Sequence, residues 1–582
     1  MSAPRIYHLK IDRFRGIKDL SWHPANGVNV ILGGGDVGKT TILDAIGLLL
    51  SPTNQTALAD TDYYSREIDA GFSIETVMSL PPATGINNQN KHAWPWQWNG
   101  AEAVVPSTDD DSKPAGEQVY RLRVRGAEHE LVYEIVQPDG TTEHLSVALR
   151  RGIGLVRLAG DDRNDRDLRL VQGSALDRLL SDKGLRSRLA SGFARTGVKD
   201  ALLDPAQELL RTLDRAFADK SLPAGLDLAI TGGQGFSVTA LIGLTADRHG
   251  VQLPLASWGA GTRRMAALVI AEQNQGETPI TLVDEIERGL EPYRQRALMA
   301  KLQAGQPQVF VTTHSPYTLA AASTAALWYV DHEGRIGALD SAKTARHRKD
   351  DPETFLARLA IVAEGATECG FVTSLLEKTV GSSVEDHGIY VTDGGGHEST
   401  LGLLEALAAG GLLFGGFADN EQGKHPTRWS TLAGKLAALL FRWTKGCLEE
   451  NLIRALPDDR LEALVIDQAD VKTGERLRTL ADRLGTGDEK AFETIKTKAG
   501  ENLKGTIIAA ALGTVPPDTA PSQQKQYEAH KRHWFKSVDG GRELAEKMFS
   551  LGVWPALRAQ LMPFCNAVRK AIGLPAVEDI AP

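Results

Sequence analysis

The sequence predicts an α/β protein with two parallel-sheet regions. Three observations support this fold class. An apolar strand, a glycine-rich loop and an apolar helix follow one another over residues 28–46, and a second apolar strand at 279–283 leads into two carboxylates. From residue 359 onward, apolar strands alternate with helical patterns, and acidic residues follow the strand ends.

The first strand leads into the most specific motif of the chain, Gly33-Gly34-Gly35-Asp36-Val37-Gly38-Lys39-Thr40, which matches the G-x-x-x-x-G-K-[ST] phosphate loop. Lys39 is expected to reach the β- and γ-phosphates of ATP, and the Thr40 hydroxyl is expected to bind Mg²⁺. The expected nucleotide-binding residues of this segment are Gly33, Gly35, Asp36, Gly38, Lys39, Thr40 and Thr41.

The bulk composition excludes several classes of protein. A net charge of −9 over 582 residues argues against a uniformly cationic nucleic-acid-binding protein, so such contacts would need a local patch or bridging metal ions. Three widely spaced cysteines exclude a cysteine-ligated zinc site and suit a reducing compartment. Without a long apolar stretch or a signal-peptide core, we expect a cytoplasmic protein with no membrane segment.

Changes in pattern along the chain predict its domain organisation. Residues 161–222 have leucines at three- to four-residue spacing, which predicts helices that form either a packed subdomain or a dimerisation arm. A polar stretch at 81–118 is expected to be an insertion or long loop, and 331–351 is the best candidate for a linker. The expected boundaries are 1–160 and 223–345 for the two parts of the first domain, 161–222 for the helical insert, and 355–582 for the second domain, a parallel α/β domain with helical insertions.

Further motifs of the first domain follow its later strands. Asp284 and Glu285 end the apolar strand 279–283, where Asp284 would hold magnesium and Glu285 would orient or deprotonate the attacking water. His314 follows the strand 309–313 and could contact the γ-phosphate. The turn Ser257-Trp258-Gly259-Ala260-Gly261 opens a helix and suits anion binding.

The order of these motifs resembles the ABC-type ATPase heads of the structural-maintenance-of-chromosomes and RecF group. The resemblance implies that Ser257, Gly259 and Gly261 cap ATP bound by another subunit, so that hydrolysis requires a homodimer or a higher homo-oligomer. Phe14-Arg15-Gly16-Ile17 and Thr61-Asp62-Tyr63-Tyr64 narrow the resemblance to the OLD (overcoming lysogenisation defect) family. Where that family commonly has Glu-Pro-Glu and later Leu-His-Pro, this chain has Glu285-Ile286-Glu287 and Leu290-Glu291-Pro292.

A second group of acidic residues follows the strands of the second region. The strand 359–363 ends in Glu364 with Glu368 four residues later, the next strand ends at Asp393, and a third leads to Asp419 and Glu421. Because the carboxyl ends of parallel strands meet at one edge of a sheet, these groups predict a metal site, with Asp393 the weaker candidate. Phosphodiester cleavage by two ions, Mg²⁺ or Mn²⁺, requires such a set of oxygen ligands.

This second region resembles the Toprim domain of OLD proteins, although the usual Asp-x-Asp is Asp419-x-Glu421 here. The resemblance implies further metal ligands in Leu448-Glu449-Glu450-Asn451-Leu452, namely Glu449 and Glu450. It also implies that Lys536 stabilises the transition-state phosphate.

These features together lead to the hypothesis of an ATP-hydrolysing, metal-dependent DNA endonuclease in phage defence or DNA processing. The alternatives are a nucleotide-switched DNA-binding or repair scaffold with a silent Toprim domain, and an RNA-cleaving toxin. A silent domain would be expected to lose Glu364 or Asp419, and this chain keeps both. The sequence does not separate DNA from RNA, and it leaves open a helicase partner and whether ATP activates or inhibits cleavage.

Overall fold

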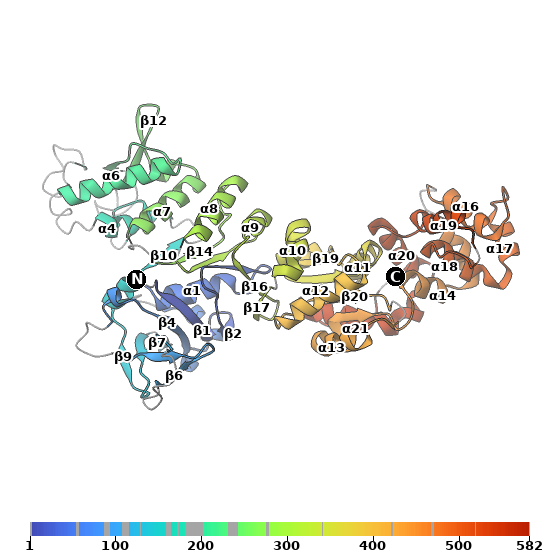
Figure 1. The fold of residues 1–582 in the computed structure, drawn as a ribbon, viewed down its shortest axis with the longest axis horizontal. Coiled ribbons are helices and arrows are strands. Elements are labelled where there is room, and N and C mark those ends of the chain that lie inside the picture. The colour runs from blue at the N-terminus through green and yellow to red at the C-terminus, as the bar shows by residue number, and fades with distance from the viewer. Residues whose placement is uncertain are drawn as a thin grey trace. The chain divides into compact units, whose positions relative to one another are not determined.

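The structure is a computed structural model of the whole chain. It describes residues 3–53, 58–86, 93–106, 116–128, 130–158, 164–171, 174–180, 199, 202–230, 242–274, 279–305, 307–339, 341–420, 423–466, 471–517 and 519–580. These residues form two compact units, 1–32 with 38–328 and 33–37 with 329–582, whose elements are labelled in Figure 1. None of the described helices has the length and apolar character needed to cross a membrane.

The first unit begins with an antiparallel sheet in the order β2-β1-β4-β7, with β8 and β9 continuing from β7. Its strands are β1 (Arg5–Phe14), β2 (Ile17–Trp22), β4 (Phe72–Ser79), β7 (Glu117–Ala127), β8 (Glu130–Val136) and β9 (Thr142–His144). Alternate apolar side chains of β1 are buried, as its sequence pattern predicts.

The prediction that residues 81–118 form an insertion or loop outside the core is wrong for part of this stretch. It contains β5 (Trp96–Trp98) and β6 (Ala103–Val104), and β5 pairs with the start of β7. Trp96 is buried, and its indole N–H donates to the carbonyl of Val136 at 2.8 Å. The polar residues around Trp96 hid the strand, since its pairing partner lies outside the local pattern.

A parallel sheet forms the centre of the first unit, and it confirms the α/β prediction there. The strand order is β10-β14-β15-β3-β16, and neighbours from β10 to β3 are parallel. The strands are β10 (Leu155–Leu158), β14 (Ile280–Val283), β15 (Val309–Thr312), β3 (Val28–Leu32) and β16 (Ala326–Val330). The helices of this region are α1 (Lys39–Leu49), α2 (Val147–Ile153), α8 (Pro292–Ala304) and α9 (Pro316–Ala321).

The helical insert packs into a core of its own chain. Its described helices are α3 (Asn164–Asp167), α4 (Ala175–Leu180) and α6 (Asp204–Asp219). α4 and α6 share a core with α7 (Ala260–Asn274) and with β11 (Asp227–Ile230) and β12 (Ile242–Arg248), and β12 pairs with β13 (Val251–Pro254). Leu176, Leu210 and Phe217 are buried there. The described part therefore forms a packed subdomain, while Leu185 and Leu189 of the predicted pattern lie outside the described residues.

The second unit contains the predicted alternation of parallel strands and helices. The strand order is β19-β18-β20-β21, with all neighbours parallel. The elements are β18 (Leu359–Ala363), α11 (Ala366–Val380), β19 (Ile389–Asp393), α12 (His397–Ala409), β20 (Gly415–Ala418), α13 (Pro426–Leu436) and β21 (Leu440–Arg442).

The stretch 331–351 is not the irregular linker that its charged composition predicts. It contains β17 (Ile336–Ala338) and α10 (Ser341–Asp350). Asp331 is fully buried, and its carboxylate accepts hydrogen bonds from the backbone N–H groups of Glu333 at 2.9 Å and Arg335 at 3.0 Å. The charged side chain of Asp331 therefore accepts hydrogen bonds from the backbone N–H groups of a folded turn, a role that composition alone does not reveal.

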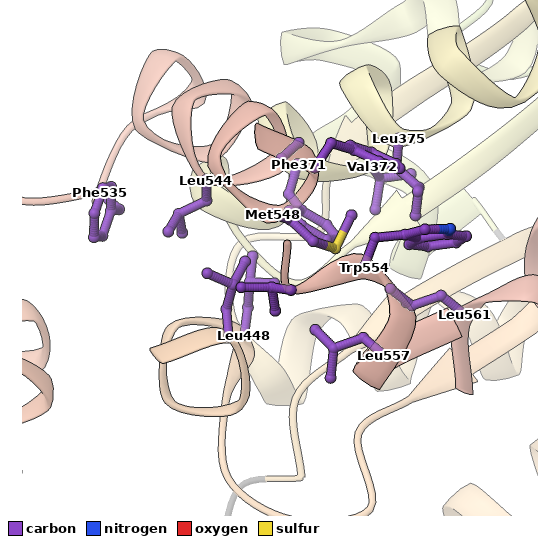
Figure 2. Packing of buried hydrophobic residues seen from close by; sticks show 14 of the residues in the cluster. Phe371, Val372, Leu375, Leu448, Phe535, Leu544, Met548, Trp554, Leu557 and Leu561 are labelled. Atoms are coloured by element: carbon purple, nitrogen blue, oxygen red, sulfur yellow. The ribbon is translucent and has the colours of Figure 1, made fainter. Parts of the chain in front are cut away.

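Among the described residues, eight α-helices follow the parallel sheet of the second unit, and all of them except α19 contribute to its core. They are α14 (Leu448–Ala455), α15 (Leu461–Val465), α16 (Thr473–Leu484), α17 (Phe492–Ala499), α18 (Leu503–Leu512), α19 (Pro521–Ala529), α20 (Val538–Ser550) and α21 (Trp554–Ala571). Figure 2 shows the centre of this core, where Phe371 of α11 lies among Leu544 and Met548 of α20 and residues of α21. Sheet and added helices are therefore one folded body.

Two glycines allow α11 and α20 to pack closely. A Cβ atom on Gly370 would lie 1.8 Å from the carbonyl oxygen of Val538, and one on Gly541 would lie 1.9 Å from that of Thr367. The Thr367 hydroxyl also donates to the carbonyl of Phe535 at 3.0 Å. These contacts hold Lys536, the next residue in the chain, beside the first turn of α11.

Candidate functional sites

The phosphate-loop segment joins β3 to α1. Its backbone adopts positive φ angles at Gly33 (133°), Asp36 (60°) and Gly38 (97°), in the region that favours glycine. Lys39 is buried at the start of α1. Gly35 and Thr41 lie in the same loop and helix, so the predicted nucleotide-binding residues form one continuous segment.

A threonine–aspartate cluster follows the parallel strands of the first unit. Thr40 Oγ1 donates to Asp284 Oδ1 at 3.1 Å, and Thr312 Oγ1 donates to the same oxygen at 2.6 Å. Because β3, β14 and β15 are parallel, their carboxyl ends bring these three residues together. A hydroxyl and a carboxylate in this arrangement suit the magnesium ion of a bound nucleotide.

Glu285 has the left-handed backbone conformation, with φ of 46°, which is uncommon for a residue other than glycine. Its N–H donates to Thr312 Oγ1 at 2.8 Å, so the cluster holds this conformation. His314 follows β15, and desolvation together with the charge of Lys39 lowers the pKa of its imidazole. Glu285 and His314 thus lie at the same strand edge as Lys39 and Asp284, and their catalytic roles stay predictions.

Two residues that the sequence interpretation did not propose as site residues form hydrogen bonds to the backbone or side chains at the carboxyl ends of β14 and β15. Glu287 accepts hydrogen bonds from Thr313 Oγ1 and from the N–H of His314, both at 2.6 Å. Arg264 of α7 is buried and donates to the carbonyl of Asp284, and burial lowers the pKa of its guanidinium to about 10. The Glu-x-Glu spacing after β14 was a sequence signal for Glu287.

The turn before α7 contains the residues expected to cap ATP in another subunit. Ser257 and Gly259 are exposed, and Ser257 Oγ donates to the carbonyl of Pro254 at 2.7 Å. Gly261 is buried, and a Cβ atom there would lie 2.2 Å from the carbonyl oxygen of Gly289. Backbone packing within the chain therefore accounts for Gly261, and a contact of this turn with ATP stays a prediction.

The two segments that narrowed the family resemblance lie side by side. Arg15 Nε donates to Asp62 Oδ1 at 3.0 Å, and the Arg15 N–H donates to the Asp62 carbonyl at the same distance. The Arg15 guanidinium also pairs with Asp44 of α1. These contacts brace the helix that follows the phosphate loop.

In the second unit, two predicted metal ligands meet at the edge of the parallel sheet. Glu364 directly follows β18 and Asp419 follows β20, and both are buried. The Asp419 N–H donates to Glu364 Oε2 at 3.0 Å, and the Leu448 N–H donates to Asp419 Oδ1 at 3.0 Å. The parallel order thus brings Glu364 and Asp419 together, as their positions in the sequence predict.

Glu368, Glu449 and the partly exposed Lys536 complete a group that we call the carboxylate cluster: Glu364, Glu368, Asp419, Glu449 and Lys536. Glu368 and Glu449 lie in the first turns of α11 and α14, with 5% and 0% of their surfaces exposed. Lys536 Nζ lies 2.6 Å from Glu449 Oε1, whereas Glu449 Oε2 has no hydrogen-bond partner in the described part of the chain.

Burial and mutual repulsion shift the pKa values of the cluster. Desolvation, followed by the charge of Glu449, raises the pKa of Glu368 to about 7. Desolvation, followed by the charges of Glu368 and Glu449, raises the pKa of Asp419 to about 9. Burial acts to lower the pKa of Lys536, but the charge of Glu449 outweighs it and raises that pKa. The cluster therefore favours bound positive charge.

The donor atoms suit Mg²⁺ or Mn²⁺, since all are hard carboxylate oxygens and Glu449 Oε2 is buried without a partner. Within the described ranges, however, no three His, Cys, Asp or Glu side chains are arranged to hold a metal ion. The oxygens of Glu364 and Asp419 instead accept backbone N–H groups. Glu421, another predicted ligand, lies outside the described residues.

The structure does not bring Glu450 into the cluster. Its carboxylate accepts a hydrogen bond from Arg454 Nε at 3.0 Å on the same helix. Consecutive helical residues point about 100° apart, so Glu449 and Glu450 cannot both face one point. The weaker candidate, Asp393, accepts the Gly395 N–H at 2.8 Å and so stabilises its own loop.

His397 was missed by the sequence interpretation. Only 8% of its side chain is exposed, and Nδ1 lies 3.5 Å from Glu364 Oε2. Its position directly after Gly394-Gly395-Gly396, at the end of a predicted strand, was the available signal.

Comparison with known protein families gives a match within the first unit. A family model described as "AAA domain, putative AbiEii toxin, Type IV TA system" matches residues 108–320, which include β14, β15 and the cluster residues Asp284 and Thr312. The first unit is therefore similar to AAA-type ATPase domains over residues 108–320. No curated protein matches the chain.

Several solved structures are similar to this chain at low identity. A structural-maintenance-of-chromosomes head bound to the C-terminal winged-helix domain of ScpA is 16% identical, with a TM-score of 0.37, and the match covers 59% of this chain and 99% of that one. The recombination mediator RecF in its ATPrS form is 13% identical, with a TM-score of 0.35, covering 58% and 99%. A head from Pyrococcus furiosus with an extended coiled coil is 13% identical, with a TM-score of 0.34, covering 59% and 98%.

Proposed function

We propose that this chain is an ATP-hydrolysing, divalent-metal-dependent DNA endonuclease of the OLD type, acting in phage defence or DNA processing. The observation that carries the proposal is the carboxylate cluster. Four buried carboxylates lie beside one lysine, desolvation and repulsion among them raise the pKa values of Glu368 and Asp419, and an ion that binds there relieves this repulsion. Such a cluster has a clear use in phosphodiester cleavage, which needs cations held by converging carboxylates.

The carboxylates and the lysine of the cluster have different proposed roles. Glu364, Glu368, Asp419 and Glu449 would hold two Mg²⁺ or Mn²⁺ ions, with Glu421 as a further candidate ligand. When bound, the ions supply Lewis acidity and lower the pKa of the attacking water. Lys536 would donate to a phosphate oxygen where negative charge develops in the transition state.

The ATPase unit completes the proposal. Lys39, Thr40 and Asp284 would hold Mg²⁺ and ATP, Glu285 would orient the attacking water, and His314 would contact the γ-phosphate. The exposed Ser257 and Gly259 would cap the nucleotide of a second copy, which makes the active species a homodimer or a higher homo-oligomer. The helical insert, 161–222, is the proposed constitutive contact.

A second candidate function is a nucleotide-switched DNA-binding scaffold whose second unit does not cut. It is favoured by the backbone N–H groups that donate to one oxygen of Glu364 and one of Asp419, since these hydrogen bonds give both buried carboxylates a structural role that needs no metal ion. The two candidates differ in whether purified protein cleaves a phosphodiester bond.

The test incubates purified full-length protein with supercoiled plasmid and Mg²⁺ or Mn²⁺, with and without ATP, and includes a parallel arm with end-labelled RNA. Glu364→Ala and Asp419→Ala should each abolish nicking, and the double variant should lose no more than either single one, since ligands of one site act as a unit. Asp386→Ala removes an exposed carboxylate of the same unit and should cut like the parent. Undiminished cutting by Glu364→Ala would favour the scaffold, and cleavage of RNA alone would favour the toxin.

A further inference from the structure

We infer that His397 and Trp429 form a positioning pair that holds Glu364 through an imidazole fixed in one tautomer. The inference rests on the proposed function, in which Glu364 binds metal, and extends it to two residues outside the expected ligand set.

The backbone around Glu364 brings His397 to this place. The Gly394 N–H donates to the carbonyl of Ala363, and the Gly396 N–H donates to that of Glu364, both at 2.8 Å. Gly395 and Gly396 have φ angles of 78° and 97°, which other residues rarely adopt. The loop therefore folds back over the end of β18 and begins α12 with His397 facing Glu364.

The partners of the imidazole fix its tautomer. Trp429 Nε1 lies 3.4 Å from His397 Nε2, and an indole N–H can only donate. Nε2 must therefore be the acceptor, which places the proton of the neutral ring on Nδ1. Nδ1 has no hydrogen-bond partner in the described part of the chain and lies 3.5 Å from Glu364 Oε2, the acceptor toward which its N–H can turn.

The remaining contacts close a ring around Glu364. The Arg442 guanidinium lies over the indole of Trp429, 5.1 Å from the ring centroid, and Arg442 Nε donates to the carbonyl of Asp419 at 3.2 Å. The Asp419 N–H returns to Glu364 Oε2 at 3.0 Å. The ring thus runs through Glu364, His397, Trp429, Arg442 and Asp419.

The ring acts on one oxygen of Glu364. Oε2 accepts the Asp419 N–H at 3.0 Å, and His397 Nδ1 lies 3.5 Å from the same oxygen, so rotation of the carboxylate would break the first contact and lengthen the second. The orientation of Oε1, the oxygen left for a cation, is then set before the ion arrives. Residues that orient metal-binding carboxylates in this way change metal affinity by about 10- to 100-fold when they are removed.

The variants separate the effect of the His397 N–H donor from the effect of side-chain size. His397→Leu removes the N–H donor, His397→Asn restores an N–H donor close to the position of Nδ1, and Trp429→Phe keeps an aromatic ring while removing the group that fixes the tautomer. Mn²⁺ affinity of the full-length chain is measured by electron paramagnetic resonance titration. ATP hydrolysis, which depends on residues of the first unit, reports that each variant is folded.

We expect His397→Leu to weaken Mn²⁺ binding about 10- to 100-fold, and His397→Asn to recover most of the affinity. In metal-free parent protein labelled with ¹⁵N-histidine, the His397 signals should show the Nδ1–H tautomer, and in Trp429→Phe they should show a mixture. Parent-like Mn²⁺ affinity of His397→Leu, an Nε2–H tautomer in the parent, or equal losses in the Leu and Asn variants would each overturn the inference.

Glu364→Ala separates this inference from the proposed function. If Glu364→Ala binds Mn²⁺ as tightly as the parent, the proposed metal site is wrong. If Glu364→Ala loses binding while His397→Leu keeps it, only the positioning role fails.

Discussion

At the residue scale, the position of each side chain on its strand or helix determines which of the predicted site residues contact one another. Thr40 and Thr312 both contact Asp284 because β14 and β15 end, and the loop after β3 leads into α1, at the same edge of a parallel sheet, and that relation is visible in the sequence. Glu449 and Glu450 are adjacent in the sequence, yet only Glu449 joins the carboxylate cluster. The rotation of α14 about its axis depends on its packing against distant helices, so the sequence could not separate the two.

The phosphate loop allows a direct test at this scale. Lys39→Ala removes the charge that pairs with the β- and γ-phosphates, and ATP turnover should fall more than about 100-fold. Glu285→Gln keeps the shape but not the base, so it should bind ATP and hydrolyse it about 100- to 10,000-fold more slowly. Both are measured by phosphate release and by binding of a fluorescent nucleotide, with Glu291→Gln, at an exposed position, as the control. Parent-like turnover in either variant would contradict the assigned role.

His530 links stability to pH. Burial, and then the positive charge of Arg483, lowers its pKa from 6.5 to about 4. The folded state therefore favours the neutral ring. The associated stability is complete above pH 6.5, falls as the pH decreases from 6.5 to about 4, and amounts to ~3 kcal/mol. His530→Gln, which cannot titrate, should show a smaller loss over this range in urea unfolding monitored by tryptophan fluorescence. Identical pH dependence in the two proteins would exclude the effect.

At the scale of helices and strands, the sequence predicts the elements with a local apolar pattern and misses those that depend on distant packing partners. The strands around Glu364 and Asp419 were predictable because their apolar runs are local. The strand β5 was not, since it depends on pairing with β7. Helical insertions in the second region were expected, but their bounds were not, because the apolar residues of α16, α17 and α18 join a core assembled from distant parts of the chain. Local pattern identifies an element, whereas its packing partners determine what it positions.

The close contact between α11 and α20 predicts how stability and cleavage change when a methyl group is added at Gly541. In Gly541→Ala the new Cβ would lie 1.9 Å from the carbonyl oxygen of Thr367, so α20 must move away from α11. We expect a loss of about 1–3 kcal/mol of stability and a marked loss of cleavage, because Lys536 precedes α20. Gly474→Ala, in α16 with open space around it, should be neutral or stabilising. The measurements are urea unfolding and plasmid nicking. Equal behaviour of the two variants would show that the close contact does not position Lys536.

At the scale of the whole molecule, the chain has two separate sets of charged residues. The nucleotide-binding residues come from the ends of β3, β14 and β15, and the carboxylate cluster comes from β18, β20, α11, α14 and the segment before α20. Both edges were predicted from residues that follow apolar strands.

Assembly is the prediction that belongs to this scale. Since Ser257 and Gly259 are exposed, we expect them to contact ATP held by a second copy, with a dimer mass by light scattering. Glu285→Gln should accumulate the ATP-bound dimer, and Ser257→Arg should reduce ATP turnover while leaving nucleotide binding intact. Gln252→Arg, at an exposed position before this turn, is the matched control. A monomer mass with and without ATP would refute the assembly.

The ion pair between Lys536 and Glu449 has a consequence for the order of events at the proposed nuclease centre. At 2.6 Å, the ammonium group serves as an internal counter-ion for a carboxylate that is otherwise enclosed by protein. When a divalent cation takes over that role, the ammonium is released and can turn to a phosphate. Metal loading would then precede productive engagement of the nucleic acid, and DNA affinity measured by fluorescence anisotropy should rise with Ca²⁺ in the parent and much less in Lys536→Ala. An equal rise in both proteins would mean that the lysine is not the group released.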